Sequence, residues 1–259
     1  SIGDISILVD QIVDRMKVGG RLFYIGAGTS GRLGVLDAAE CPPTYGVDKG
    51  LVVGIMAGGD NAMFTAQEGA EDSLELAAKD LAYYNLSEKD SVIGLAASGR
   101  TPYVLGGLRY ARQVGALTGS ISCVKNAEIS EAADFPIEAV TGAEAIMGST
   151  RMKAGTAQKL ILNMISTSVM IKLGKVYQNY MVDVKPTNKK LVVRSKNMIR
   201  TLTGVDEERA EQLYEASGHN VKKALVMEIM NVDRESAEVA LSKGDGHIKC
   251  AIQYLGGDV

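Results

Sequence analysis

The chain has 259 residues, 46% of them hydrophobic, which is enough to bury the core of one large domain or two modest domains. The formal net charge of -3 at pH 7 argues against a nucleic-acid-binding protein, because such proteins normally carry an excess of basic residues. No apolar run reaches membrane-spanning length, and three widely spaced cysteines favour the reducing cytoplasm over a disulfide-stabilised fold.

Strand and helix patterns alternate from the start of the chain to residue 173. Short apolar runs predict strands at 21–25, 51–56, 92–96, 117–124 and 136–140. Helical patterns lie at 8–16, 30–40, 61–84, 102–113, 128–133 and 152–173, and Pro42 and Pro43 are expected to end the second of these helices. Because the strands are nearly all apolar and alternate with helices, we expect an α/β fold: a parallel five-stranded sheet flanked by helices, in the flavodoxin-like three-layer arrangement.

The composition changes after Met181, where the strand pattern stops. Short helical patterns separated by turn residues predict a small all-α domain in this part of the chain. We therefore expect two domains, residues 1–185 and residues 186–259, joined by a segment at 183–190. No internal repeat is evident.

A glycine- and hydroxyl-rich turn at 26–32 follows the first predicted strand and precedes a helix. Such a turn directs backbone N–H groups, hydroxyl donors and a helix N-terminus at one anion. Its G-x-G-x-x-G spacing also matches a dinucleotide-binding fingerprint, but the expected acidic residue is missing at the end of the second strand, and Thr29 and Ser30 crowd the loop. A turn needed only for packing is the other alternative.

Two further clusters repeat this chemistry, at 97–102 after the third strand and at 148–153 before the long helix. For the second cluster, an ordinary helix N-cap by Ser149 or Thr150 is the structural alternative. Together the three clusters favour a shared site for the phosphate of a small molecule. The residues expected to bind it are Gly28, Thr29, Ser30, Ser98, Gly99, Thr101, Ser149 and Thr150.

Proton transfer in this part of the chain would depend on carboxylates, because the only histidines, His219 and His247, lie near the C-terminus. Glu40 is predicted at the end of a helix, where a buried carboxyl would suit a general acid and a solvated one would be an ordinary surface residue. Glu68 and Glu71 are predicted to share one helix face, either with one of them as a base or as a solvated acidic stripe.

These motifs resemble those of the sugar isomerase (SIS) domain family, and most of all those of its etherase branch. The most specific block is Glu40-Cys41-Pro42-Pro43-Thr44-Tyr45-Gly46. Further matching blocks are the turns at 26–32 and 97–103, Glu68-Gly69-Ala70-Glu71-Asp72-Ser73, and residues 149–159. The C-terminal tail resembles the small helical domain of the etherases.

The resemblance implies a bacterial cytoplasmic enzyme that cleaves the D-lactyl ether of a phosphorylated amino sugar, N-acetylmuramic acid 6-phosphate, without a metal or another cofactor. It assigns the acid to Glu40 and the base to Glu71, with Glu68 in the substrate site. It also implies a homodimer and a further segment ahead of Ser1. A non-catalytic sugar-phosphate-binding regulator of the glucokinase regulatory protein type is the main alternative, and an aldose–ketose phosphate isomerase is the third.

Overall fold

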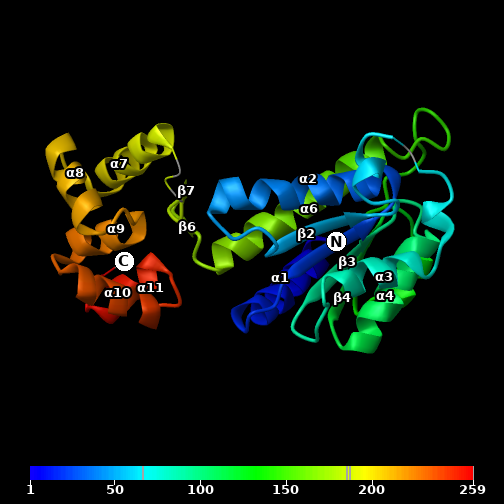
Figure 1. The fold of residues 1–259 in the computed structure, drawn as a ribbon, viewed down its shortest axis with the longest axis horizontal. Coiled ribbons are helices and arrows are strands. Elements are labelled where there is room, and N and C mark those ends of the chain that lie inside the picture. Colours follow the sequence, from blue (N-terminus) through cyan, green and yellow to red (C-terminus); the bar gives the residue numbers. More distant parts are fainter. Residues whose placement is uncertain (66, 185, 187, 259) are drawn as a thin grey trace. The chain divides into compact units, whose positions relative to one another are not determined.

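The computed structural model describes residues 1–65, 67–184, 186 and 188–258, which divide into two compact units (Figure 1). The first unit comprises Ser1–Cys41 and Asp48–Val169, and the second comprises Pro42–Val47 and Met170–Val259. The domain boundary predicted after Lys185 falls on a residue outside the described part of the chain, so that boundary stays a prediction.

A five-stranded parallel sheet forms the centre of the first unit, as predicted. Its strands are β1 Leu22–Gly26, β2 Val52–Met56, β3 Ser91–Leu95, β4 Leu117–Ser122 and β5 Phe135–Glu138, in the order β2-β1-β3-β4-β5. All residues of β1, β3 and β4 are buried, which explains the mostly apolar sequences of β1 and β3, whereas β4 also buries Thr118, Ser120 and Ser122. This strand order is that of flavodoxin-like folds, in which ligands bind at the carboxyl ends of the strands where the order reverses.

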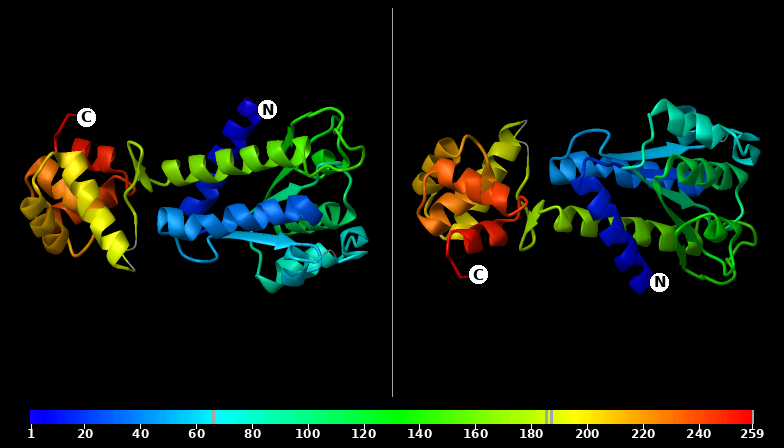
Figure 2. Two further views of the ribbon diagram at one scale, coloured as in Figure 1. Left: turned by 90° about the horizontal axis from the view of Figure 1, so that it is seen from above. Right: turned by 90° about the horizontal axis from the view of Figure 1, so that it is seen from below.

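Helices cover both faces of this sheet. Helices α2 (Gly28–Tyr45) and α6 (Lys153–Lys172) lie side by side on one face, and α3 (Leu76–Tyr83) and α4 (Pro102–Val114) lie on the other (Figures 1 and 2). The unit also contains α1 (Ile2–Lys17) and the single turn α5 (Glu128–Glu131). In the described ranges, no helix combines the length and the apolar character that crossing a bilayer requires.

The prediction that Pro42 and Pro43 end the second helix is wrong, because both prolines lie inside α2. Proline removes a backbone donor, but its fixed φ is itself helical, so a helix can pass through it when tertiary packing supports the chain. The final turn forms beyond the prolines, where the Gly46 N–H donates to the Pro42 carbonyl at 3.0 Å. Glu40 therefore lies within the helix and is exposed, not at its C-terminal end.

The single long helix predicted at 61–84 is also wrong. The structure has the short 3-10 helices η1 (Asp60–Met63) and η2 (Ala70–Asp72), followed by α3. Gly69 interrupts the helical path with a φ of 77°, a left-handed conformation that glycine adopts without steric cost. Glu68 and Glu71 consequently lie in a loop and a tight turn instead of on one face of a long helix.

The second unit is mainly helical, as predicted, and includes a short hairpin of β6 (Val176–Tyr177) and β7 (Tyr180–Met181) that the sequence did not predict. Its helices are α7 Lys189–Thr203, α8 Glu207–Ala216, α9 Val221–Met230, α10 Arg234–Lys243 and α11 Ile248–Tyr254. The pairs α8–α9 and α10–α11 repeat one pattern: Asp206 and Asp233 cap α8 and α10 by accepting from the N–H three residues on, each at 2.8 Å.

Asp90 joins the amino ends of β1 and β3 and supplies a test of the fold. Its carboxylate, only 1% exposed, accepts hydrogen bonds from the backbone and guanidinium of Arg21 and from Ser87. Burial alone would raise the pKa of Asp90, but these hydrogen bonds from Arg21 and Ser87 hold it below its usual value.

We predict that Asp90→Asn lowers the free energy of unfolding by about 2 kcal/mol at neutral pH, because an amide replaces a carboxylate that accepts charged hydrogen bonds. The carboxylate stabilises the native chain above its unfolded pKa of about 4, and this contribution is lost as pH falls below that value. Urea unfolding of both proteins at pH 7 and pH 3 measures this. A variant that matches the native chain at pH 7 would contradict the prediction.

Candidate functional site

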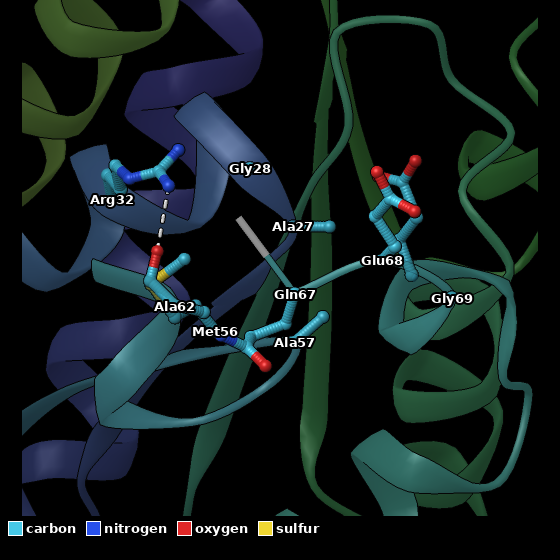
Figure 3. Close-up of a pocket in the computed structure, with 10 residues that line it drawn as sticks. Ala27, Gly28, Arg32, Met56, Ala57, Ala62, Gln67, Glu68 and Gly69 are labelled. Carbon is cyan, nitrogen blue, oxygen red and sulfur yellow. Dashed lines mark hydrogen bonds between the residues drawn. The ribbon is translucent and has the colours of Figure 1, made fainter. Parts of the chain in front are cut away.

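A cavity of about 260 Å³ opens at the carboxyl ends of β1 and β2 (Figure 3). Its wall consists of the glycine turn after β1, the end of β2 and the loop that leads to η2. The lining residues are Ala27, Gly28, Arg32, Met56, Ala57, Ala62, Gln67, Glu68, Gly69 and Glu71. This is the edge of the sheet at which ligands bind in such folds.

Glu68 and Glu71 both line this cavity, although the long helix predicted to carry them is absent. Both side chains are exposed, and Figure 3 shows Glu68 across the cavity from Arg32. The left-handed turn at Gly69 separates the two glutamates and brings both to the same wall. Two carboxylates at the wall of one cavity can serve as bases or as acceptors for hydroxyl groups of a ligand.

Arg32 ends the first glycine turn and holds the loop after β2. Its guanidinium donates to the carbonyls of Ala62 and Met63, at 2.7 and 2.9 Å, and one of these bonds is drawn in Figure 3. These bonds join the turn after β1 to η1, so two walls of the cavity are tied together. Arg32 thereby supports the shape of the cavity.

The first predicted phosphate cluster is divided between the cavity and the helix interface. Gly28, with a φ of 54°, is exposed and lines the cavity, while Thr29 is half-buried. Ser30 is buried, and its hydroxyl donates to Oε1 of Gln158 on α6 at 2.8 Å. Within this chain Ser30 therefore joins α2 to α6, and its backbone N–H group remains near the start of the helix.

The second cluster follows β3, the neighbour of β1 in the sheet. Ser98 is exposed, and Gly99 has a φ of 75° and could not carry a side chain, because a Cβ there would lie 2.5 Å from the Cβ of Ala127. Thr101 precedes α4 without a capping hydrogen bond from its side chain, and Pro102 occupies the first helical position. The hydroxyls of Ser98 and Thr101 are thus placed at the carboxyl edge of the sheet.

The third cluster differs from the expectation, because a glutamate, and neither Ser149 nor Thr150, covers the N-terminus of α6. The Glu144 carboxylate accepts from the N–H groups of Lys153 and Ala154, at 3.0 and 2.9 Å, and these bonds lower its pKa. The sequence offered no spacing signal for this contact. The helix N-terminus does attract an anion, and in this chain that anion is the protein's own carboxylate.

The cysteines are poorly suited to nucleophilic chemistry. Cys41 and Cys123 are buried, and burial raises the pKa of the two thiols to about 12 and about 11. Within the described ranges, no group of three or more His, Cys, Asp or Glu side chains is arranged to hold a metal ion. The carboxylates that line the cavity are therefore the side chains best suited to acid–base chemistry.

Glu40 is the predicted catalytic residue that does not line the cavity, and of the residues expected to bind phosphate only Gly28 lines it. Glu40 lies on the same helix as Gly28 but twelve residues further on, and at about 1.5 Å per residue this separates them by about 18 Å. Glu68, Glu71 and Gly28 meet at the cavity, and the hydroxyl clusters lie around the same edge of the sheet. The pairing of Glu40 with Glu71 stays a prediction.

Two protein-family models match the chain. The N-terminal SIS domain of glucokinase regulatory protein matches residues 4–112, and the C-terminal lid domain of that protein matches residues 178–254. The two matches correspond to the sheet-containing part and the helical part of the chain.

Known relatives match over nearly the entire sequence. An N-acetylmuramic acid 6-phosphate etherase from Clostridium botulinum is 61% identical over 254 residues, which are 98% of this chain and 84% of the relative. One from Caldanaerobacter subterraneus is 55% identical over 97% of this chain and 82% of the relative. Among solved structures, a phosphoheptose isomerase from Francisella tularensis has a TM-score of 0.51 at 16% identity, covers 65% of this chain and 86% of its own, and supports the fold alone.

We predict that Arg32→Met loosens the cavity wall, because it leaves the carbonyls of Ala62 and Met63 without their donor. Amide hydrogen exchange at residues 57–65 should become faster, with a loss of about 1–3 kcal/mol in local or global stability. Arg100→Met is the matched control, since Arg100 ends the second glycine turn and is exposed. Equal exchange in the Arg32 variant and the native chain would refute this role.

Proposed function

Because the chain belongs to the N-acetylmuramic acid 6-phosphate etherase family, we propose that it cleaves the D-lactyl ether of N-acetylmuramic acid 6-phosphate. The products are D-lactate and N-acetylglucosamine 6-phosphate. The high identity to etherases along almost the whole chain is the observation that carries this proposal. The presence of both Glu40 and Glu71 favours the enzyme over a non-catalytic regulator.

The proposed reaction is an elimination followed by addition of water. In the open-chain sugar the C1 aldehyde makes the C2 proton acidic, and Glu71 removes it. The electron pair forms the C2–C3 double bond while the lactyl oxygen leaves C3 and takes a proton from Glu40. Water then adds at C3, Glu40 takes the proton of that water, and Glu71 returns a proton to C2.

The phosphate anchors the sugar far from the bond that breaks, so its binding energy can orient C2 and C3 against the glutamates. Since Glu144 already covers the first amides of α6, we expect the turns after β1 and β3 to supply most of the phosphate contacts. Gly28 and Ser98 are exposed at these turns, and both support this assignment. Ser149 and Thr150 would contribute through their hydroxyls.

We infer that the enzyme is a homodimer in which Glu40 serves the site of the partner subunit. The separation of Glu40 from the cavity within one chain is the first support. The second is a stripe on α2, formed by Thr29, Leu33, Leu36 and Glu40, whose spacing places them on one helix face. Leu36, near the middle of this stripe, is 49% exposed.

The geometry of a twofold dimer fits this assignment. In such a dimer the same surface packs against itself, and with the twofold axis perpendicular to α2 the two copies of α2 would run antiparallel, so that the Glu40 end of one approaches the Gly28 end of the other. Leu160 and Met164, near the middle of the neighbouring helix α6, are 50% and 39% exposed and would extend the apolar contact.

We propose that residues 1–185 form the catalytic sugar-phosphate-binding domain and residues 186–259 the small helical domain. The compact units divide at Met170 instead, because the end of α6 and the β6–β7 hairpin pack with the helical part. We also infer a cytoplasmic location, since Cys41, Cys123 and Cys250 are all free thiols.

Glu71→Gln should lower kcat for D-lactate release by about 10²- to 10⁴-fold, because an amide cannot remove the C2 proton. Affinity for N-acetylglucosamine 6-phosphate, measured by calorimetry, should change little. Glu75→Gln is the control, since Glu75 is exposed on the same segment. A reaction of the native enzyme in deuterium oxide should place deuterium at C2. Loss of product binding together with turnover in the Glu71 variant would indicate a structural role instead.

Mixing the inactive Glu40→Gln and Glu71→Gln proteins tests the shared site. After subunit exchange, statistical mixing would make half of the dimers heterodimers with one intact site each, so about a quarter of native activity should return. Sedimentation of the native protein should report a dimer. A mixture that stays inactive although its subunits exchange would show that each chain uses its own Glu40.

A further inference from the structure

The turn of α2 that carries Glu40 is weakly held by its own backbone. Pro42 and Pro43 have no N–H, so the carbonyls of Ala38 and Ala39 lack the donors that would normally lie four residues on. The two backbone hydrogen bonds that would normally span Glu40, from residue 42 to 38 and from residue 43 to 39, are therefore missing. The direction in which Glu40 projects must depend on side-chain contacts that fix α2 from outside.

Asp37 supplies such contacts one turn before Glu40. Its Oδ1 accepts a hydrogen bond from the side-chain amide of Asn163 at 2.8 Å and from the hydroxyl of Ser166 at 3.1 Å. Both donors lie on α6, so one carboxylate oxygen ties the two helices together. The Asp37 side chain is only 6% exposed, and a carboxylate in this position is costly to bury unless it is hydrogen-bonded.

The same carboxylate faces the sheet. Its Oδ2 and the hydroxyl of Tyr24 on β1 are both buried. Burial raises the pKa of Asp37, while hydrogen bonds from Asn163, Ser166 and Tyr24 act in the opposite direction. Since the desolvation cost of a buried carboxylate offsets much of what its hydrogen bonds contribute, the fixed geometry of these contacts is the property that bears on α2.

We propose that Asp37 is a positioning residue that ties α2 to α6 and so fixes the orientation of Glu40. The inference rests on the proposed function, because it takes Glu40 as the acid. A polar tether suits this task because hydrogen bonds have a defined geometry, whereas an apolar contact tolerates sliding and rotation of the helix. Without the hydrogen bonds of Asp37, the turn that contains the two prolines would let the Glu40 carboxyl move. Proton transfer needs a closely defined distance, so even a small movement would slow the reaction.

The test compares Asp37→Ala and Asp37→Asn with two further variants. Asn163→Ala removes one of the two hydrogen bonds from the α6 side, and Asp90→Asn alters another buried carboxylate, at the amino ends of β1 and β3. The measurements are kcat and KM for D-lactate release, the melting temperature, and amide hydrogen exchange in peptides covering residues 38–46.

Asp37→Ala should lower kcat on the order of 10²-fold with little change in KM, and should speed exchange at residues 38–46. Asn163→Ala should show the same pattern to a smaller extent. Asp37→Asn should retain most of the activity, since its amide oxygen can accept both hydrogen bonds. Asp90→Asn should lower the melting temperature and leave kcat and that exchange unchanged.

The proposal is overturned if Asp37→Ala lowers kcat no more than Asp90→Asn does, or if exchange at 38–46 stays at the native rate. It is equally overturned if Asp37→Asn is as inactive as Asp37→Ala, because the charge and not the tether would then be what matters. If the native chain releases no D-lactate, the proposed function fails, and the exchange measurement still decides whether Asp37 tethers α2.

Discussion

The hydrogen bonds between α2 and α6 are the constraint on which the proposed site depends. Helix α2 begins in the glycine turn that lines the cavity and continues past Glu40, so it carries both the phosphate end and the acid end of the proposed chemistry. Ser30 bonds to Gln158 near the first end, and Asp37 bonds to α6 closer to the second. Because α2 is hydrogen-bonded to α6 at two points along its length, both of its ends keep a fixed position relative to α6, even though its last turns contain two prolines.

The sheet and its glycine turns were predictable because each has a local cause. Nearly continuous apolar runs such as those of β1 and β3 have few alternatives to a buried parallel strand, and the left-handed conformation of Gly99 follows from its sequence position after a strand. The two wrong helix boundaries have nonlocal causes. Helix α2 continues through Pro42 and Pro43 although both lack the backbone donor, and Arg32 bonds to the carbonyls of Ala62 and Met63 in the segment predicted as one long helix.

The candidate site was predictable in its chemistry and only partly in its arrangement. Gly28, Glu68 and Glu71 line one cavity, and the turn that carries Ser98 follows the carboxyl end of the adjacent strand β3, since the carboxyl ends of parallel strands lie at one edge of the sheet. The capping of α6 by Glu144 depends on the path of a long loop, which residue spacing does not encode. The position of Glu40 relative to a cavity depends on the length of α2 and, in our proposal, on a second chain. A local sequence motif indicates neither of these.

The repeated helical hairpins of the second unit have a consequence for how that unit can be divided. Corresponding alanines, Ala210 with Ala237 and Ala224 with Ala251, are buried in one common apolar cluster. Each hairpin therefore completes the interior of the other, as neighbouring units do in repeat proteins. A chain cut between α9 and α10 would therefore yield two fragments that each lack half of this apolar cluster and must reassociate to bury it.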